Sequence, residues 1–595
     1  MVEDDQAFHP DYLVSARNLL HYIALRRHDL RSLQVRLAQL GLSSLGRSEA
    51  HVSASVEAVL HVLERLAGPQ GSCSQVDAPA PEFAEGPHLL LRHTETLLGP
   101  EPGDRHVRIM VTMPSEAAND YKLVHDLLAQ GMDCMRINCA HDNPAVWRRM
   151  IEHLRRAEGA LRRSCRIAMD LAGPKLRTGP VMPGPAVLHI RPKRDAFGRV
   201  VTPARVWLYD EASGVEPPTQ ADAALPVAGE WLAGMAKGDR LRLQDTAGRE
   251  RQLEIIEAEP HGVWAQCAHS TYVASGTALE HLSLQSGAAL RFDGAVGSLV
   301  PAAGFLTLRQ GDLLLITPDQ RPGEPATLDS FGKVLGPARI GCTLPEVFAH
   351  VRPADLIWLD DGKIGGIVQR VDASGLLVRV LHARARGEKL RGDKGINLPD
   401  TDLHLSALTV KDRDDLRFAV DHADIVGLSF VNSDADVREL IKEIEKAGSR
   451  RPGIILKIET RRGFENLPGM LLEAMRTLAC GVMIARGDLA VECGYERMAE
   501  VQEEILWICE AAHVPVIWAT QVLETLAKDG IPSRAEITDA AMGHRAECVM
   551  LNKGPNIIQA VKSLDDILRR MQTHQDKKRP MMRDLQLARA FHPAV

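Results

Sequence analysis

Two short apolar runs in the C-terminal half of the chain each end in charged residues. They are Ile454-Ile-Leu-Lys457-Ile-Glu459 and Met483-Ile-Ala-Arg486-Gly487-Asp488. A buried strand that emerges at a lysine and a carboxylate presents both groups to a ligand. Glu459 and Asp488 suit Mg²⁺, which prefers one or two carboxylates together with substrate oxygens. Lys457 and Arg486 would then meet an anion such as a phosphorylated or enolic substrate.

Strands and helices must position these groups, and the pattern of apolar residues predicts where they lie. Short apolar runs occupy residues 107–113, 133–138, 166–172, 423–430, 453–459, 481–487, 514–520 and 547–552. Helical stretches follow most of them, including residues 115–130, 434–447, 498–513 and 534–545. Apolar strands that alternate with helices indicate a parallel sheet buried on both faces. Eight of them predict an α/β fold, a closed (β/α)₈ TIM barrel, in which the active site lies at the carboxyl ends of the strands.

Polar residues gather at those predicted strand ends, which favours a real site. They are Arg136, Asn138, Asp170, Lys457, Glu459, Arg486, Asp488 and Thr520.

Composition limits the class of protein. With 595 residues, two to four domains are expected. The 45% apolar and 25% charged residues are typical of a globular enzyme, and the net charge of −7 predicts no general attraction to nucleic acid or membrane. We find no run of eighteen apolar residues and no secretory leader pattern, and the ten cysteines form no C-x-x-C pair. We therefore expect a cytoplasmic protein with reduced thiols.

The domain organisation follows from changes of pattern along the chain. Helical spacing between residues 12 and 67, with a linker after it, predicts an N-terminal all-α module and linker over residues 1–100. Residues 101–178 form the first part of the barrel, and residues 396–595 form its second part with a C-terminal tail. Between them, residues 179–395 are rich in Val, Thr, Gly and Pro and predict a β domain inserted after the third strand.

The inserted domain contains an expected internal duplication. From Glu230-Trp-Leu-Ala through Asp239, Leu241, Leu243 and Asp245, the sequence parallels Glu346-Val-Phe-Ala, Asp355, Ile357, Leu359 and Asp361 at a constant offset. A matched set of this length is a moderately specific sign of a repeat.

At this point the chain resembles the pyruvate kinase family. The matching segments are Gly131-Met-Asp-Cys-Met-Arg136-Ile-Asn138-Cys-Ala-His141, Asp170-Leu-Ala-Gly-Pro-Lys175-Leu-Arg177-Thr-Gly, Asp360-Asp-Gly-Lys-Ile, Lys394-Gly-Ile-Asn-Leu-Pro, Lys457-Ile-Glu459, Ala485-Arg-Gly-Asp488-Leu, Ala519-Thr520-Gln and Pro532-Ser-Arg534-Ala-Glu-Ile-Thr-Asp. They follow the family's order over residues 105–575. The resemblance implies Mg²⁺-dependent phosphoryl transfer from phosphoenolpyruvate to ADP, giving pyruvate and ATP, with the inserted domain as a lid.

The resemblance also implies roles for individual residues. Glu459 and Asp488 would bind Mg²⁺, or Mn²⁺ in its place. Lys457 would neutralise the transferring phosphoryl group, and Arg136 would bind phosphate through its guanidinium fork. Thr520 would lie near the enolate face, where Gly487 and Asp488 would receive the substrate carboxylate at a helix start. The remaining assignments concern the nucleotide site, which His141, Arg177 and Lys394 would line.

Departures from the family pattern carry their own predictions. Of the family's K⁺ ligands, Asn138 and Asp170 remain, whereas Ala140 and Leu171 replace a serine and a threonine. Lys175 replaces a nearby glutamate, and its ammonium would substitute for the ion. We therefore expect K⁺-independent behaviour. Asp393 replaces the first of a pair of lysines on the nucleotide side.

The last strand and the chain end differ as well. The sequence Asn552-Lys-Gly-Pro-Asn stands where the family has Ser-Gly-Glu-Thr, which puts proton delivery in question. The chain ends soon after the eighth predicted helix, so we expect no C-terminal regulatory domain and none of its sugar-phosphate activation. We also expect a homo-oligomer.

Several alternatives stay open at this level. Lys457 and Glu459 could form a structural ion pair, Arg136 a salt bridge at the barrel rim, and Lys175 a salt bridge with Asp170. The chain could be a catalytically weak sensor that binds phosphoenolpyruvate or nucleotide. It could also perform Mg²⁺-dependent enolate chemistry on an oxoacid. The preferred nucleotide, the allosteric effector and the roles of the N-terminal module and the insert are not determined by the sequence.

Overall fold

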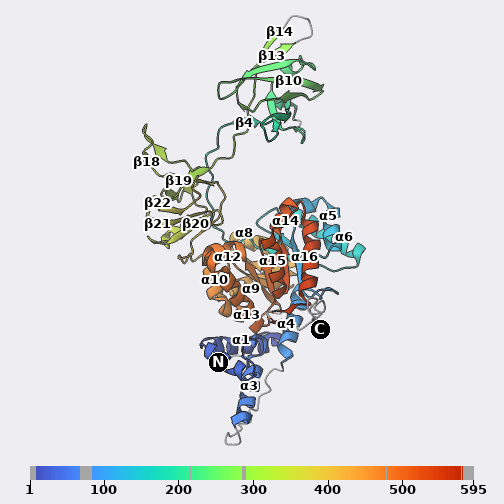
Figure 1. The fold of residues 1–595 in the computed structure, drawn as a ribbon, viewed down its shortest axis with the longest axis vertical. Coiled ribbons are helices and arrows are strands. Elements are labelled where there is room, and N and C mark those ends of the chain that lie inside the picture. The colour runs from blue at the N-terminus through green and yellow to red at the C-terminus, as the bar shows by residue number, and fades with distance from the viewer. Residues whose placement is uncertain are drawn as a thin grey trace, which may run out of the picture. The chain divides into compact units, whose positions relative to one another are not determined.

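A computed structural model describes residues 8–67, 83–214, 216–283, 290–477, 479–577 and 579–580 (Figure 1). The chain divides into two compact units. The first contains residues 1–177, 344–383 and 395–595, and the second contains residues 178–343 and 384–394. Among the described helices, none combines the length and the apolar character needed to span a bilayer.

In the described part of the first unit, eight parallel strands close into a barrel. They are β1 (Arg108–Thr112), β2 (Cys134–Asn138), β3 (Arg166–Asp170), β25 (Ile425–Leu428), β26 (Gly453–Ile458), β27 (Cys480–Ala485), β28 (Val516–Ala519) and β29 (Cys548–Leu551). Each strand pairs with its neighbour in chain order, and β29 returns to pair with β1 through Arg108 opposite Cys548. The predicted barrel and its inserted β region are confirmed.

Helices surround the barrel strands, as Figure 1 shows. They are α5 (Tyr121–Ala129), α6 (Pro144–Leu161), α8 (Val410–His422), α9 (Asp434–Ala447), α10 (Arg461–Glu465), α11 (Leu467–Ala474), α12 (Arg486–Cys493), α13 (Met498–Ala511), α14 (Glu524–Asp529), α15 (Arg534–Met542) and α16 (Ile557–Met571). Capping boxes begin several of them: Ser433 with Asp436 at α9, and Ser533 with Glu536 at α15. Such reciprocal side-chain bonds satisfy the free amides at a helix start.

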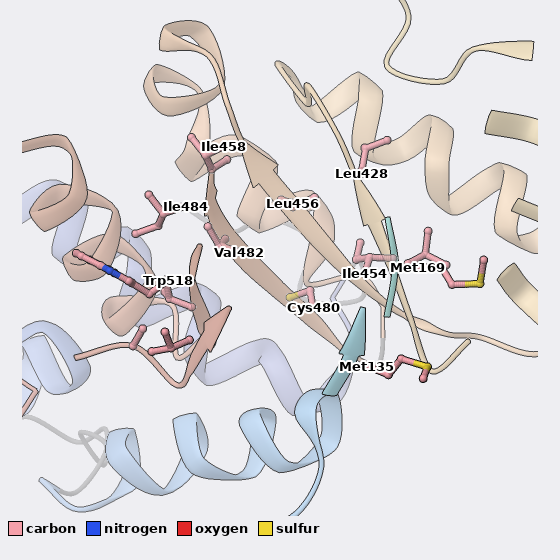
Figure 2. Packing of buried hydrophobic residues seen from close by; sticks show 14 of the residues in the cluster. Met135, Met169, Leu428, Ile454, Leu456, Ile458, Cys480, Val482, Ile484 and Trp518 are labelled. Carbon is pink, nitrogen blue, oxygen red and sulfur yellow. The ribbon is translucent and has the colours of Figure 1, made fainter. Parts of the chain in front are cut away.

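The strands alternate between two apolar layers. Ile454, Leu456 and Ile458 of β26 pack outward in the layer shared with the helices, beside Val482 and Ile484 of β27 (Figure 2). Ile455 and Met483 belong instead to a separate cluster inside the barrel. Because side chains alternate along a strand, this parity decides which residues reach the barrel axis.

The N-terminal module contains α1 (Leu13–Arg26), α2 (Arg31–Gln39), α3 (Val52–Ala67) and α4 (Glu85–Leu98). The sequence analysis assigned no element to residues 85–98, and residues 68–82 of its linker lie outside the described residues. Leu97 and Leu98 at the end of α4 join the cluster inside the barrel and close its floor. A Cβ atom on Gly453 or Gly481 would lie 2.4 or 2.5 Å from a Leu97 methyl, so these glycines make room for that side chain.

Buried polar contacts fix the module to the barrel. His513, which follows α13, lies with its Nδ1 3.0 Å from Ser15 Oγ and its Nε2 2.8 Å from the Ala50 carbonyl. His93 Nδ1 lies 2.7 Å from the His513 carbonyl, and Asn18 donates to the Ala511 carbonyl. Burial lowers the pKa of His513 from 6.5 to about 4, so the ring is neutral at physiological pH.

The second unit is built mainly from antiparallel β structure. Its main sheet has the order β14 (Leu290–Ala295), β13 (Ala278–Ser283), β9 (Arg240–Gln244), β10 (Glu250–Glu259), β11 (Gly262–Cys267), β7 (Ala204–Asp210) and β8 (Ala223–Val227). Shorter strands include β4 (Val187–Ile190), β12 (Thr271–Ala274), β15 (Leu306–Leu308), β16 (Leu313–Thr317) and β19 (Ala338–Gly341). The pairing is parallel between β7 and β8 and between β16 and β19. In the first unit, β20 (Leu356–Leu359), β21 (Ile364–Asp372) and β22 (Gly375–His382) form a meander, and β24 (Ile396–Asn397) pairs with β20.

Two segments share one hydrogen-bonding pattern. The Gly238 amide donates to the Ile255 carbonyl, Ile255 donates to the Asp239 carbonyl, and Asp239 Oδ2 accepts from the Ala236 amide. The same three bonds recur at Ala354 with Val368, Val368 with Asp355, and Arg352 with Asp355 Oδ2. The meander β9–β10–β11 likewise matches β20–β21–β22. This shared pattern is what an internal duplication would produce, and we keep the duplication as a proposal.

Candidate active site

Side chains alternate along each barrel strand, and this alternation brings the predicted polar residues together at one end of the barrel. Cys134, Ala168, Ile425 and Ile455 belong to the cluster inside the barrel. Residues two or four positions further along those strands project to the same side, at the carboxyl end of the barrel. This rule places Arg136, Asp170, Ser429, Lys457 and Glu459 around the barrel mouth, and all five side chains are buried.

A buried carboxylate and two cations form the centre of this group. Asp170 Oδ2 accepts from Arg136 Nε at 2.8 Å and lies 3.5 Å from Lys457 Nζ. Lys457 Nζ also lies 3.1 Å from Glu459 Oε1 and donates to Ser429 Oγ at 2.7 Å. Arg136 Nη1 donates to Thr112 Oγ1 at 2.9 Å. The cations are thus held in fixed positions before any substrate arrives.

The charges in this group compensate one another. Burial alone would raise the pKa of Asp170, but Arg136 and Lys457 outweigh it and hold that pKa below its ordinary value. Burial alone would lower the pKa of Lys457, but the charges of Glu459 and Asp170 outweigh it and raise that pKa. Both residues are therefore ionised at neutral pH, as an ammonium that meets a phosphoryl group must be.

Glu459 and Asp488 are the two carboxylates predicted to hold a divalent metal. Glu459 Oε2 accepts from the Phe430 amide at 2.7 Å, and Asp488 lies in the first turn of α12. The described residues contain no group of three or more His, Cys, Asp or Glu side chains arranged to hold a metal. Two carboxylates fit Mg²⁺, because this ion keeps several waters and uses substrate oxygens for its remaining positions.

Lys175 forms a salt bridge with one of these carboxylates, that of Asp488. Its Nζ donates to Asp488 Oδ1 at 2.9 Å and to Oδ2 at 3.0 Å. It also lies over the Phe430 ring, 5.7 Å from the ring centroid. The alternative of a Lys175–Asp170 salt bridge is therefore wrong: Asp170 pairs with Arg136 and Lys457, whereas Lys175 pairs with Asp488.

Thr520 has a backbone conformation that is rare for a β-branched residue. Its φ is +64°, in the left-handed region, and Gln521 follows with φ of +59°. Its Oγ1 accepts from the Gly487 amide at 3.0 Å. Arg486 donates to the Ala519 and Thr520 carbonyls and forms an ion pair with Asp539. Arg486 therefore fixes the Thr520 turn, and the contact with a substrate anion that the sequence analysis expected of it stays a prediction.

The residues predicted to line the nucleotide site are divided between the two units: His141 and Arg177 belong to the first and Lys394 to the second. His141 lines a cavity of about 340 Å³ that Arg136 and Asn138 also line. Burial lowers the pKa of His141, and the nearby positive charges of Lys553, Arg177 and Arg136 lower it further. Lys394 belongs to the second unit, where its amide donates to Thr178 Oγ1.

Comparison with known proteins identifies the family of the chain. The model of the pyruvate kinase barrel domain matches residues 104–197 and 325–555, which together make up more than half of the chain. The chain belongs to the pyruvate kinase family.

Curated pyruvate kinases match parts of the chain. The pyruvate kinase of Agaricus bisporus is 37% identical over 216 residues, covering 35% of this chain and 39% of that protein. Pyruvate kinase 2 of Candida glabrata is 36% identical over 246 residues, covering 40% and 46%. The pyruvate kinase of Bacillus licheniformis is 27% identical over 335 residues, covering 54% of each. The matched part thus spans between about two fifths and about half of each of these relatives.

The two remaining ligands of the family's monovalent-cation site have protein partners here. Asn138 Oδ1 accepts from the Ala140 amide at 3.1 Å, so it closes its own turn. Asp170 Oδ2 is taken by Arg136 and Lys457, although its buried Oδ1 has no hydrogen-bond partner in the described part of the protein.

The sequence analysis missed several groups of the site. Ser429 bridges Lys457 Nζ and the Leu171 carbonyl, and Thr112 accepts from Arg136. Each is a polar residue at the end of an apolar run, which is the signal that could have found it. Asn552 and Lys553, which line the cavity beside Arg136 and His141, were noticed only as a departure from the family pattern.

Proposed function

We propose that this protein catalyses phosphoryl transfer from phosphoenolpyruvate to ADP, giving pyruvate and ATP. One observation carries the proposal: Lys457, buried and ionised, lies 3.1 Å from Glu459 and 3.5 Å from Asp170 Oδ2, the oxygen that also accepts from Arg136. A site of two fixed cations and adjacent acids suits a reaction in which the protein mainly positions groups and neutralises charge. The family of the chain supports the same reaction.

The residues would divide the work as follows. Arg136 is oriented by Asp170 and Thr112, and it would bind phosphate. Lys457, oriented by Ser429, would neutralise the charge on the transferring group. Glu459 and Asp488 would hold Mg²⁺, which supplies Lewis-acid polarisation of the substrate when bound.

Thr520 and Gly487 would face the enolate part of the substrate. Thr520 Oγ1 now accepts from the Gly487 amide, so a substrate carboxylate at that amide would release the hydroxyl for another contact. The left-handed conformation of Thr520 costs about 1–3 kcal/mol and persists only where neighbouring groups enforce it. Arg486, bonded to the Thr520 carbonyl, enforces it here.

We further propose that the reaction does not require K⁺. Lys175 brings a permanent positive charge to the metal carboxylate, and the two remaining cation ligands are engaged by protein groups. Stimulation by K⁺ over Na⁺ of more than a few-fold would contradict this proposal.

The test is ATP formation from phosphoenolpyruvate and ADP with Mg²⁺ and without K⁺, beside a Lys457→Met control. We expect turnover in the ordinary enzyme range of about 1–10³ s⁻¹, lost in the control. Absence of turnover with and without K⁺, together with measurable phosphoenolpyruvate binding, would contradict the proposed reaction.

A sensor that binds the same ligands without turning them over is the second candidate. The observation that favours it is the loop after β29, where Lys553 lines the cavity in place of the family's Ser-Gly-Glu-Thr sequence. Binding without turnover would support this candidate, and turnover that does not depend on nucleotide would favour enolate chemistry on an oxoacid.

A further inference from the structure

The loop after β3 carries Lys175, and a side chain from a distant helix holds that loop. The Ala172 and Gly173 amides of the loop both donate to Asp412 Oδ1, at 2.9 and 3.3 Å. Asp412 lies in the first turn of α8, 240 positions after Ala172, and it is 0% exposed. The loop and the start of α8 are therefore joined inside the protein and not at its surface.

The cap of α8 accounts for only one of the two oxygens of this carboxylate. Asp412 forms a capping box with Thr409, in which Asp412 Oδ2 accepts from the Thr409 amide at 2.9 Å and from the Thr409 hydroxyl at 2.6 Å. In the capping box of α9, Asp436 likewise uses Oδ2, which accepts from the Asn432 and Ser433 amides. Capping a helix thus needs one oxygen, and the second oxygen of Asp412 holds the loop.

The opposite side of the loop packs against the residues that follow β25. Gly173 has a φ of +71°, and a Cβ atom at this position would lie 3.0 Å from Phe430 Cδ2. The Lys175 amide donates to the Gly173 carbonyl at 3.0 Å, so the backbone turns directly from the held glycine to the lysine. Fixed between the carboxylate of α8 and this packing, the loop keeps the Lys175 ammonium within 3.0 Å of both Asp488 oxygens.

We propose that Asp412 is a positioning residue, which fixes the loop after β3 so that Lys175 stays on the Asp488 carboxylate. It acts through Lys175 and not by a contact of its own with the substrate or the metal. This inference rests on the proposed function, in which Asp488 holds the divalent metal. The residue lies outside the motifs that carry the family resemblance.

The hydrogen bonds of the loop give the physical reason. A backbone amide inside a protein is costly to leave without an acceptor. Asp412→Ala removes the acceptor of two neighbouring loop amides at once, so the loop would move until both amides found new partners. Lys175 would move with the loop, and its contact with Asp488 would weaken. The charge that competes with a metal for this carboxylate would then be withdrawn.

The experiment measures Mn²⁺ binding by electron paramagnetic resonance for the wild type, Asp412→Ala, Lys175→Met and the double variant. We expect Asp412→Ala to bind Mn²⁺ about twofold to fivefold more tightly, because the ammonium that competes for Asp488 is released. The double variant should match Lys175→Met within about 1.5-fold, since Asp412 has nothing to act through once the Lys175 charge is gone.

Thr409→Val is the matched control. It breaks the same capping box but leaves Asp412 Oδ1 with its two loop amides. Both Thr409→Val and Asp412→Ala should lose stability, because both remove part of the helix cap. Only Asp412→Ala should change the affinity for Mn²⁺, and Thr409→Val should bind the ion as the wild type does.

Asp412→Glu is a second variant, which carries the test if the alanine prevents folding. Glutamate is a regular member of capping boxes, so the helix start is kept, but its extra methylene displaces the carboxylate relative to the loop amides. It should tighten Mn²⁺ binding by a smaller factor than Asp412→Ala. A chain that folds with neither variant would overturn the inference, because a positioning residue acts on the site and not on the fold.

The outcomes separate this inference from the proposed reaction. Mn²⁺ affinity that responds to Asp412 only when Lys175 is present supports the inference, even in a protein without turnover. Unchanged or weaker Mn²⁺ binding by Asp412→Ala overturns it. Effects that add in the double variant, an equal shift in Thr409→Val, or a wild-type protein that binds no Mn²⁺ overturn it as well. Turnover observed beside any of these contrary results leaves the reaction standing.

Discussion

The contact between Lys175 and Asp488 makes a quantitative prediction about metal binding. The Lys175 ammonium lies within 3.0 Å of both Asp488 oxygens, and the side chains are 25% and 19% exposed. Any cation that binds Asp488 must therefore compete with this ammonium or accept it as a neighbour. Both situations weaken metal binding, so Lys175→Met, which keeps the length of the side chain and removes its charge, should strengthen it.

The size of the effect follows from the exposure of the pair. At about 3 Å and an effective dielectric constant of about 20, the bare Coulomb energy is about 5 kcal/mol. Exposed pairs contribute only about 0.2–1 kcal/mol after desolvation and side-chain ordering. This pair is less exposed than those, so we take about 1 kcal/mol, which corresponds to about fivefold tighter binding.

The assay is titration of the protein with Mn²⁺. The electron paramagnetic resonance signal of the free ion gives the concentration of Mn²⁺ that is not bound. Lys122→Met is the control, because it removes the same charge from an exposed pair with Asp126 on α5. The control should bind Mn²⁺ as the wild type does. Unchanged or weaker Mn²⁺ binding by Lys175→Met would refute the reasoning. The proposal that Lys175 substitutes for K⁺ also predicts that the same variant gains stimulation by K⁺.

Three further predictions concern the N-terminal module, the barrel floor and the strained turn. The pKa of His513 is about 4 when the ring is buried and about 6.5 when it is released, so the stability from its docking is complete above about pH 6.5 and is lost as the pH falls towards 4, by up to about 3 kcal/mol. Hydrogen exchange in α1, corrected for intrinsic rates, should therefore become faster as the pH falls over this range. Equal protection of α1 at pH 7 and 4.5 would contradict this prediction. Leu97→Ala should lower the unfolding free energy of the first unit, measured by urea denaturation, by about 2–5 kcal/mol. The control is Leu91→Ala on the same helix, where the side chain is 41% exposed and its loss should cost less than about 1 kcal/mol. Similar costs for the two variants would show that Leu97 does not fill the floor of the barrel. Thr520→Gly should relieve backbone strain, so its unfolding free energy should be no lower than that of the wild type. Its rate of phosphoryl transfer should fall at least about tenfold. A loss of more than about 1 kcal/mol of stability would show that the turn is not strained.

The barrel was predictable from the sequence because its strands are short apolar runs buried on both faces. The predicted runs at 453–459 and 547–552 contain β26 (Gly453–Ile458) and β29 (Cys548–Leu551). The end of a buried strand is also where a polar residue stands out, so Lys457 and Glu459 could be found from their position alone. Periodicity therefore gives both the scaffold and much of its active end.

The partners of these residues were not predictable, because they depend on loop conformation. Lys175 and Asp488 are 313 positions apart, and nothing local distinguishes that pairing from the expected one with Asp170. Arg486 looked like an anion ligand by its position, yet it bonds the Thr520 carbonyl and Asp539. The docking of the N-terminal module through His513 likewise depends on a contact across 498 positions.

The place of the insert within the barrel has a consequence for synthesis of the chain. The Ile167 amide at the start of β3 bonds to Asp424 beside β25, 257 positions later, and Arg105 reaches Asp565 across 460 positions. At a ribosomal rate of about 5–20 residues per second, β3 waits about 10–50 s for its neighbour. During that interval the first three strands have an unpaired edge, which is a template for association with other chains. The nascent protein therefore passes through an aggregation-sensitive stage whose length is set by the insert and not by the barrel itself.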